Sequence, residues 1–143
     1  MIEIIRATKL PQQAAAHYVR IQGMARQHKI TLDEEFDEHD TADTKYIVAM
    51  DNYLPVATCR LYAIDAVQVM LGRIVVLPEY RHQGLGTKVV EAAELWAKEL
   101  GFKRSVLESR DDKLPFYERM GYKADHSRVT IGTFRCIYMD KEL

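Results

Sequence analysis

The residues best suited to bind a charged ligand lie at a junction between two kinds of pattern, within residues 71–89. An apolar, β-branched run ends at Pro78, and a short basic turn with Arg81, Gly84 and Gly86 opens directly into an amphipathic helical pattern. This order places free backbone N–H groups, a helix N-terminus and an arginine in one small volume. All three favour a phosphate group, so the junction predicts a phosphorylated ligand.

Two familiar phosphate-binding motifs do not fit this turn. A Walker loop needs Gly-Lys-Ser or Gly-Lys-Thr after a longer glycine loop, whereas the order here is Gly86, Thr87, Lys88 and the first glycine is absent. A dinucleotide fingerprint needs a third glycine where Val89 stands. From the residues alone, two interpretations stay open: a pyrophosphate cradle at the mouth of the main helix, or a plain tight turn.

A second group of chemically capable residues is acidic. The segment from Asp33 to Asp43 has seven carboxylates in eleven residues and also contains His39. It has no clean hydrophobic period, so we expect a loop or a short helix. Such a segment would attract a cationic amine, and a solvated charged face is the plain alternative. His39 has the intrinsic pKa of a general base, but simple exposure explains a lone loop histidine equally well.

The composition narrows the class of protein. The chain has 143 residues, of which 48% are hydrophobic and 29% charged, and its net charge is −1. A chain of this kind folds without metal or disulfide staples, and it offers no basic field for nucleic acid or an anionic membrane. We expect no membrane span and no signal peptide. Cys59 and Cys136 are expected to be free thiols of a cytoplasmic protein, and they lack the histidine spacing of a zinc site.

Hydrophobic periodicity predicts the elements that position these residues. The pattern indicates helices that begin at Pro11 and cover 84–100 and 113–120, and strands at 2–6, 45–50, 55–64, 67–77, 105–107, 122–125 and 134–140. A three-strand meander followed by a β-α-β crossover predicts a mixed sheet with helices on both faces, which is an α/β (α+β) fold. We expect one domain, residues 1–143.

The same periodicity predicts which side chains are buried. In the first helix, Ala14, Tyr18, Ile21 and Ala25 fall on one apolar face. In the strand at residues 67–77, the odd-numbered apolar side chains are expected to alternate onto one side, with Met70, Ile74 and Val76 on the other. A strand that is apolar on both sides indicates a central position in the sheet. In the main helix, the expected core stripe is Val89, Val90, Ala93, Trp96, Ala97 and Leu100.

Two motifs together indicate which family the strand-to-helix junction belongs to. Residues 76–86, Val-x-Pro-x-Tyr-Arg-x-x-Gly-Leu-Gly, resemble the acetyl-CoA motif of the GNAT superfamily of N-acetyltransferases, and residues 115–122 resemble that family's second motif. Their separation, the order of elements and the chain length also match, so the resemblance runs from end to end. It extends to small bacterial members that include glyphosate N-acetyltransferase. It implies the family fold, a mostly antiparallel sheet of six to seven strands flanked by about four helices.

The resemblance implies a position for acetyl-CoA across a V-shaped opening between strands 67–77 and 105–107. Backbone groups of the first strand would pair with the pantetheine arm, and the N–H of Val76 would polarise the thioester carbonyl. Backbone amides of the glycine turn would hold the pyrophosphate, because glycines let a phosphate approach the main chain. The cofactor-binding residues implied are Ile74, Val75, Val76, Arg81, His82, Gln83, Gly84, Leu85, Gly86 and Thr87.

The resemblance also implies catalytic roles. Tyr117 matches the family's tyrosine acid, which protonates the departing thiolate, although a helical tyrosine beside Phe116 is often simply core. Glu108 ends the fifth predicted strand, where cofactor and substrate would meet, and is the expected base. His126 is a weaker candidate for the base. The final hairpin lacks the histidine base of some small relatives. The substrate-binding residues expected are Glu35, Glu38, His39 and Asp40.

The activity that the resemblance implies is transfer of an acetyl group from acetyl-CoA to a primary amine of a small molecule or peptide. The amine would attack directly within a ternary complex, and the acidic segment favours a cationic acceptor. A non-catalytic acyl-CoA sensor with the same fold, which would not need Tyr117, is one alternative, and a nucleotide-phosphate binder is another. Expected partners are the amine substrate and, because homodimers are common in the family, a second copy of the chain, without nucleic acid or membrane.

Overall fold

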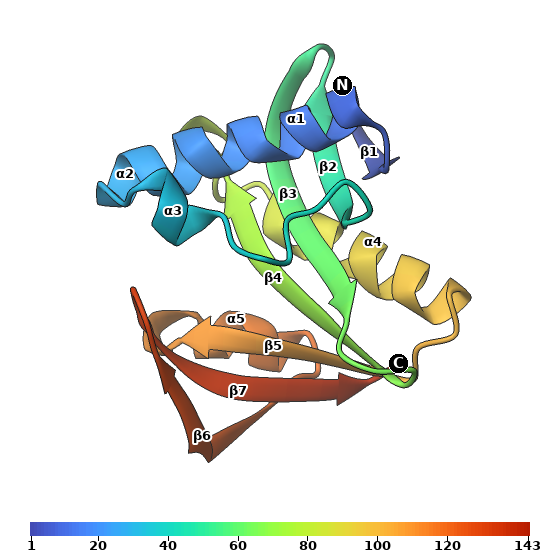
Figure 1. Cartoon of the computed structure of the whole chain (residues 1–143), viewed down its shortest axis with the longest axis vertical. Helices are drawn as coiled ribbons and strands as arrows, with labels where there is room; N and C mark the ends of the chain where they lie inside the picture. The colour runs from blue at the N-terminus through green and yellow to red at the C-terminus, as the bar shows by residue number, and fades with distance from the viewer.

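A seven-stranded sheet forms the centre of the protein (Figure 1). The computed structural model describes residues 1–143, and the strand order across the sheet is β1-β2-β3-β4-β5-β7-β6. The strands are β1 (Ile2–Ala7), β2 (Lys45–Asp51), β3 (Leu54–Ala63), β4 (Gln68–Val76), β5 (Arg104–Arg110), β6 (Lys123–Ile131) and β7 (Arg135–Glu142). Only β4 and β5 are parallel neighbours. The predicted mixed, mostly antiparallel sheet is confirmed.

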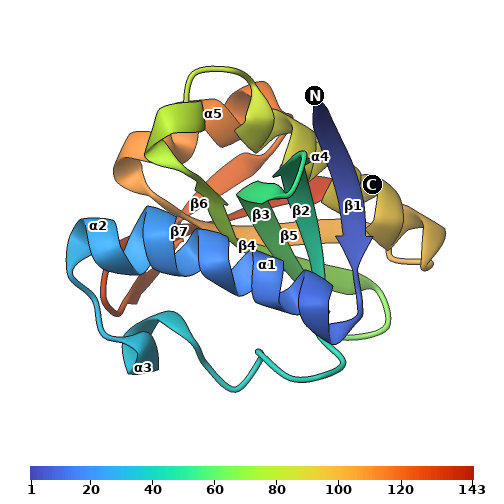
Figure 2. The same ribbon diagram turned by 90° about the horizontal axis from the view of Figure 1, so that it is seen from above.

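Helices cover the sheet on both faces (Figure 2). The helical segments are α1 (Leu10–Arg20), a π-helical turn (Ile21–Ala25), α2 (Arg26–His28), α3 (Leu32–Glu35), α4 (Leu85–Glu99) and α5 (Leu114–Arg119). The first four lie on one face, and α4 and α5 lie on the other. Because α1 continues through the π-helical turn into α2, the helices number about four, as expected. None of the helices combines the length and the apolar character needed to cross a lipid bilayer.

Helix α4 packs as its amphipathic pattern predicts, except at its end. Its buried side chains are Leu85, Val89, Val90, Ala93, Trp96 and Ala97. Burial of each large apolar side chain contributes about 1.5–3 kcal/mol, so this stripe fixes the helix against the sheet. Leu100 is 48% exposed, in contrast to the expected core position. The helix ends at Glu99, so Leu100 is its C-cap residue and lies beyond the buried stripe, directly before the left-handed turn at Gly101, which has φ of 100°.

The buried face of the first helix differs from the predicted one, of whose four residues only Ala25 is buried. Ala14 is exposed and Tyr18 is 40% exposed, whereas Gln13 and Arg20 are buried. Gln13 donates from Nε2 to the carbonyl of Thr44 at 3.1 Å, and Arg20 is bonded to carboxylates. A count of apolar residues misplaces this face, because polar side chains with buried partners occupy it.

A β-bulge in β4 changes which side chains share a face. Leu71 lies opposite Leu61 of β3, and Val76 lies opposite Ala57, so the same span contains one more residue on β4 than on β3. The extra residue lies beside Arg73, which has φ of 48°. Directly opposed residues share a face, so odd-numbered residues of β4 switch faces at the bulge. The predicted unbroken alternation of this strand is therefore wrong.

Strands β4 and β5 separate along their length. They pair only where Gln68 to Met70 lie beside Arg104 to Val106. Beyond those residues the two arrows diverge, from the end near the C-terminus toward their tips (Figure 1). The V-shaped opening expected between these strands is thus present, and the bulge at Arg73 lies on its β4 side.

Candidate active site

The opening between β4 and β5 is part of a cleft of about 1000 Å³. Its walls come from the π-helical turn, β4, the glycine turn, β5, α5 and the hairpin that joins β6 to β7. Nine of the ten expected cofactor-binding residues line it: Ile74, Val75, Val76, Arg81, His82, Gly84, Leu85, Gly86 and Thr87. Gln83 does not line the cleft, and its side chain is exposed. The fold therefore gathers the residues of the sequence junction around one cavity.

The glycine turn presents unpaired hydrogen-bond donors. None of the backbone N–H groups from His82 to Thr87 donates to an acceptor of this chain, and the first bonded amide is that of Lys88, which donates to the carbonyl of Gly84 at 3.1 Å. His82 has φ of 65° and Gly84 has φ of 79°, so the turn is tightly curved. Unpaired amides at a helix N-terminus bind anions well, and a pyrophosphate suits a turn of this length.

Three residues, Gly84, Gly86 and Arg81, shape the turn in different ways. A residue other than glycine at position 84 would be strained by the left-handed φ, and a Cβ on Gly86 would lie 3.4 Å from Cζ of Phe116. Arg81 donates from Nε to the carbonyl of Val76 at 3.0 Å and from Nη2 to the carbonyl of Gly23 at 3.3 Å. Arg81 thus ties the turn to β4 and to the π-helical segment, besides bringing its charge to the cleft.

The backbone of β4 offers a donor toward the cleft. Leu77 donates its N–H to the carbonyl of Val56 on β3 at 2.9 Å. Along an antiparallel strand, successive residues direct their amides to alternate sides, so the N–H of Val76 points away from β3. On that side β5 has already diverged. The amide of Val76 is therefore free to polarise a carbonyl that lies in the opening.

Tyr117 on α5 combines burial with a free hydroxyl. Its side chain is 8% exposed and packs edge-on against Phe116, with ring centroids 4.9 Å apart. The hydroxyl makes no hydrogen bond within the chain, although the residue lines the cleft. Burial raises the pKa of Tyr117 well above its ordinary value. The phenol therefore stays protonated at neutral pH and can donate a proton or a hydrogen bond into the cleft.

Glu108 stands on β5 at the boundary between the cleft and a second groove. Its Oε2 accepts a hydrogen bond from Oγ1 of Thr130 at 2.5 Å. Its Oε1 has no partner in the chain, so one carboxylate oxygen is available to a ligand. Thr130 comes from β6, so the orientation of this carboxylate depends on two strands that are distant in the sequence.

The two cysteines are free, as expected. Cys59 is fully buried, and burial raises the pKa of its thiol to about 12. Cys136 lines the cleft, and burial raises the pKa of its thiol also. Because a thiol with a raised pKa carries little thiolate at neutral pH, neither residue has the activation of a cysteine nucleophile.

The acidic segment has a different role from the one expected for Glu35 and Asp40. Arg20 is fully buried and donates to Glu35 at 3.0 Å and to Asp40 at 2.6 Å. Asp40 also accepts from Arg60 at 3.1 Å and from the hydroxyl of Tyr46 at 2.8 Å. Both carboxylates are thus neutralised within the fold. We therefore withdraw Glu35 and Asp40 as ligands of a cationic substrate, because a buried, paired carboxylate has no free charge to offer.

The cations that neutralise this segment were not predicted. Three arginines, Arg20, Arg60 and Arg73, serve three carboxylates. Arg73 donates from Nε to the carbonyl of Glu35 at 2.9 Å and from Nη2 to Asp37 at 3.2 Å. The bulge of β4 is therefore bonded to the acidic segment. The available signal was the presence of lone arginines within the apolar patterns of a helix and two strands, since a charge there needs a partner.

Glu38 and His39 remain accessible. The side chain of Glu38 is 81% exposed, and that of His39 is 39% exposed. His39 stacks on Tyr62, with ring centroids 3.9 Å apart and an interplanar angle of 10°. Of the two, only His39 lines the groove next to Glu108. His126 is exposed on β6 and lines neither the cleft nor this groove.

Comparisons with known proteins agree with this geometry. Residues 9–122 match the model of the acetyltransferase (GNAT) family. An uncharacterized acetyltransferase of Streptococcus pyogenes is 35% identical over 97 residues, which are 68% of this chain and 66% of that protein. The chain thus spans just under two thirds of the length of this curated relative. The chain belongs to the acetyltransferase (GNAT) family.

Solved structures with the same fold include two informative cases. A putative N-acetyltransferase from Lactobacillus plantarum is 30% identical, with a TM-score of 0.87, and the match covers 99% of this chain and 98% of that one. The PaiA N-acetyltransferase from Thermoplasma acidophilum, in complex with coenzyme A, is 18% identical, with a TM-score of 0.75 over 100% of this chain and 99% of that one. The GNAT acyl-CoA N-acyltransferase fold is therefore confirmed.

Proposed function

We propose that this protein is an N-acetyltransferase that moves an acetyl group from acetyl-CoA to a primary amine of a small molecule or peptide. The observation that carries the proposal is the run of unpaired amides from His82 to Thr87 at the mouth of the cleft. The pyrophosphate of coenzyme A is an anion that such a run would bind. A CoA complex of a protein with this fold supports the same assignment.

Bound acetyl-CoA would supply an activated thioester carbonyl. In this chain, Ile74, Val75 and Val76 border the space for the pantetheine arm, and the N–H of Val76 would stabilise negative charge on the carbonyl oxygen. Glu108 would take a proton from the attacking amine, because a protonated amine has no lone pair for attack. Tyr117 would donate a proton to the departing sulfur. Attack within a ternary complex needs no cysteine nucleophile.

Ligand-induced stabilisation tests the cofactor assignment. Coenzyme A at about 100 times its dissociation constant should raise the free energy of unfolding by about 2.7 kcal/mol, which shifts Tm by roughly 5–10 °C for a chain of this size. ATP at the same concentration should give a much smaller shift, because it lacks the pantetheine arm. Thermal unfolding with each ligand is the measurement. An equal shift with ATP would favour a nucleotide-phosphate binder, and no shift with coenzyme A would refute the assignment.

A catalytically inactive acyl-CoA sensor is the second candidate. The observation that distinguishes the enzyme from it is the pair of side chains with free chemistry beside the opening, the Tyr117 hydroxyl and Oε1 of Glu108. A sensor would need neither group. Release of free thiol from acetyl-CoA in the presence of a panel of amines therefore decides between the two candidates.

A further inference from the structure

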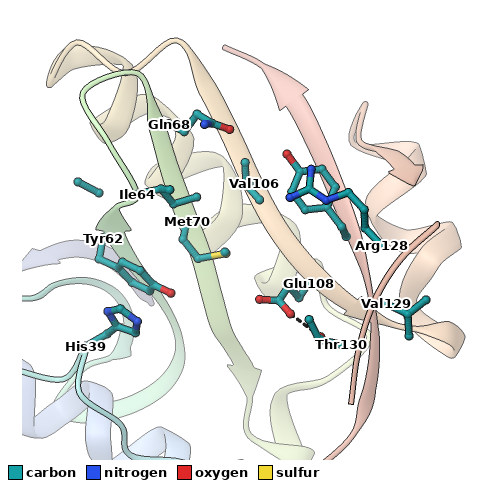
Figure 3. Close-up of a pocket in the computed structure, with 12 residues that line it drawn as sticks. His39, Tyr62, Ile64, Gln68, Met70, Val106, Glu108, Arg128, Val129 and Thr130 are labelled. Atoms are coloured by element: carbon teal, nitrogen blue, oxygen red, sulfur yellow. Dashed lines mark hydrogen bonds between the residues drawn. The ribbon is translucent and has the colours of Figure 1, made fainter. Parts of the chain in front are cut away.

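A second groove lies beside the cleft, on the face of the sheet that carries α1 (Figure 3). Its volume is about 720 Å³. Helix α1 packs against β1 to β4 and leaves the half of this face formed by β5, β7 and β6 uncovered. Glu108 and Thr130 line both the groove and the cleft. A molecule in the groove would thus reach the opening between β4 and β5 at Glu108.

Arg128 brings an unpaired cation to this groove. Register in the β6–β7 pair passes from Asp125 opposite Tyr138 directly to Val129 opposite Ile137, so the residues between Asp125 and Val129 bulge out of the ladder. The bulge lays the guanidinium of Arg128 3.5 Å from the ring centroid of Tyr138. Arg128 forms no hydrogen bond or ion pair within the chain. Bulges commonly re-aim side chains beside active sites, and this one presents a complete set of guanidinium donors.

Apart from Gln68 and Thr130, the rest of the groove is apolar or aromatic. Met70 and Val106 lie between the two sides, and the stacked rings of His39 and Tyr62 stand opposite Arg128 (Figure 3). Within the groove, Glu108 is the sole carboxylate and Arg128 is the sole arginine or lysine. The structure contains no ion pair between them. The groove therefore offers one negative and one positive group, which do not form an ion pair with each other, above an apolar floor.

We propose that this groove binds an acceptor that carries a carboxylate as well as its amine, that is, a free amino acid with an apolar or aromatic portion. The amine lies at Glu108, where it reaches the opening, and the carboxylate bonds to the guanidinium of Arg128. Glu108 on β5 is directly opposite Tyr138 on β7, and the guanidinium of Arg128 from β6 lies over the ring of Tyr138, so one strand, β7, separates the two charged groups. This inference rests on the proposed N-acetyltransferase activity and names the acceptor class of that activity.

Charge complementarity disfavours the cationic acceptor that the acidic segment first suggested. Of that segment, Glu35, Asp37 and Asp40 are bonded to arginines. A polyamine would place a second ammonium group near Arg128, and like charges repel. An amino acid places one charge of each sign against its opposite, and a guanidinium pairs a carboxylate through two parallel hydrogen bonds.

Matched pairs of acceptors test the inference. The acceptors with a carboxylate are phenylalanine, methionine and the ω-amino acids with three to six carbons. Each is compared with the amine that lacks its carboxyl group. Putrescine is included as an acceptor with two positive charges. Thiol release from acetyl-CoA gives kcat/KM for each. We expect the wild type to prefer the carboxylate member of at least one pair by roughly 10-fold or more. Arg128→Gln should reduce that preference about 10- to 100-fold, because kcat/KM should fall for the carboxylate member of the pair much more than for the matched plain amine.

Lys123→Gln provides the control, because Lys123 is an exposed cation of the same strand that lines neither the groove nor the cleft. It should keep the wild-type preference. Acetylation of amines with no preference for the carboxylate, or a preference that survives in Arg128→Gln, overturns the inference and leaves the proposed activity intact. Coenzyme A binding without turnover of any acceptor overturns the inference and favours the sensor, and failure to bind coenzyme A overturns both proposals.

Discussion

At the scale of single residues, the hydroxyl of Tyr117 is the candidate catalytic group that contributes least to holding the fold together. The ring is buried between aromatic neighbours, and the hydroxyl has no partner in the chain. Removal of one oxygen atom therefore leaves packing unchanged and deletes only the proposed proton donor. Glu108 differs in this respect, because its carboxylate also holds Thr130 of β6.

Tyr117→Phe should lower kcat about 100-fold or more and leave the dissociation constant for coenzyme A within about twofold of the wild type, since general acid catalysis contributes 10²–10⁴-fold. Steady-state kinetics and calorimetry are the measurements. Because burial raises the pKa of Tyr117, the wild-type rate should also lack any decline from ionisation of this residue below about pH 10.

Tyr53→Phe is the matched control, since this tyrosine is 91% exposed in the turn between β2 and β3. It should retain wild-type kcat. If Tyr117→Phe also turned over at the wild-type rate, another group or water would have to protonate the leaving sulfur.

At the scale of elements, the two ends of α4 carry the same backbone feature with different consequences. Gly84 precedes the helix with φ of 79°, and Gly101 follows it with φ of 100°. No atom of the chain lies within 4 Å of a Cβ built at either position. Alanine would therefore be accommodated sterically at both, and both would suffer the strain of a left-handed conformation.

Gly84→Ala and Gly101→Ala should each lower the free energy of unfolding by about 1–2 kcal/mol. Only Gly84→Ala should weaken coenzyme A binding, by roughly 10-fold or more, because position 84 belongs to the row of unpaired amides. Chemical denaturation and calorimetry on both variants separate these effects. Equal coenzyme A affinities in the two variants would show that the turn does not bind the cofactor.

Local signals predicted most elements and missed the irregular ones. The strand-to-helix junction, the hairpin of β2 and β3, and α4 follow from contiguous patterns, so the sequence was sufficient for them. The π-helical turn and the bulge at Arg73 were missed, because both depend on partners from distant elements. A Cβ on Gly23 would lie 2.5 Å from Val75, which shows how closely the π-helical turn approaches β4.

At the scale of the whole molecule, buried arginines hold the acidic segment onto the sheet. Burial alone would raise the pKa of Asp40, but hydrogen bonds and charge from Arg20 outweigh it and hold the pKa of that carboxyl well below its usual range. A carboxyl with a lowered pKa in the folded state stabilises the fold above its unfolded pKa of about 3.9, and this contribution is lost as the pH falls further. Stability should therefore decline below about pH 4.

Asp40→Asn should lower the free energy of unfolding at pH 7 by about 3–5 kcal/mol, because it leaves the charge of buried Arg20 without its bidentate partner. The variant should also lose part of the decline below pH 4. Asp43 is an exposed residue of the same segment, and its carboxylate has no bonded partner in the chain. Asp43→Asn should therefore change the free energy of unfolding by less than about 0.5 kcal/mol. Urea denaturation between pH 2.5 and 7 measures both. An unchanged acid profile in Asp40→Asn would contradict this role.

The sequence by itself determined the family motifs, the order of elements and the glycine turn at the start of α4, because a helix N-terminus and its glycines are contiguous in the chain. It also placed Tyr117 on the last helix, and it expected Glu108 to end a strand that in the structure continues to Arg110. Only the tertiary structure decided which carboxylates carry free charge, because Arg20, Arg60 and Arg73 reach the acidic segment from three separate elements. The groove of Arg128 likewise exists only where β5, β7 and a bulged β6 lie side by side, since no local pattern specifies which strands become neighbours.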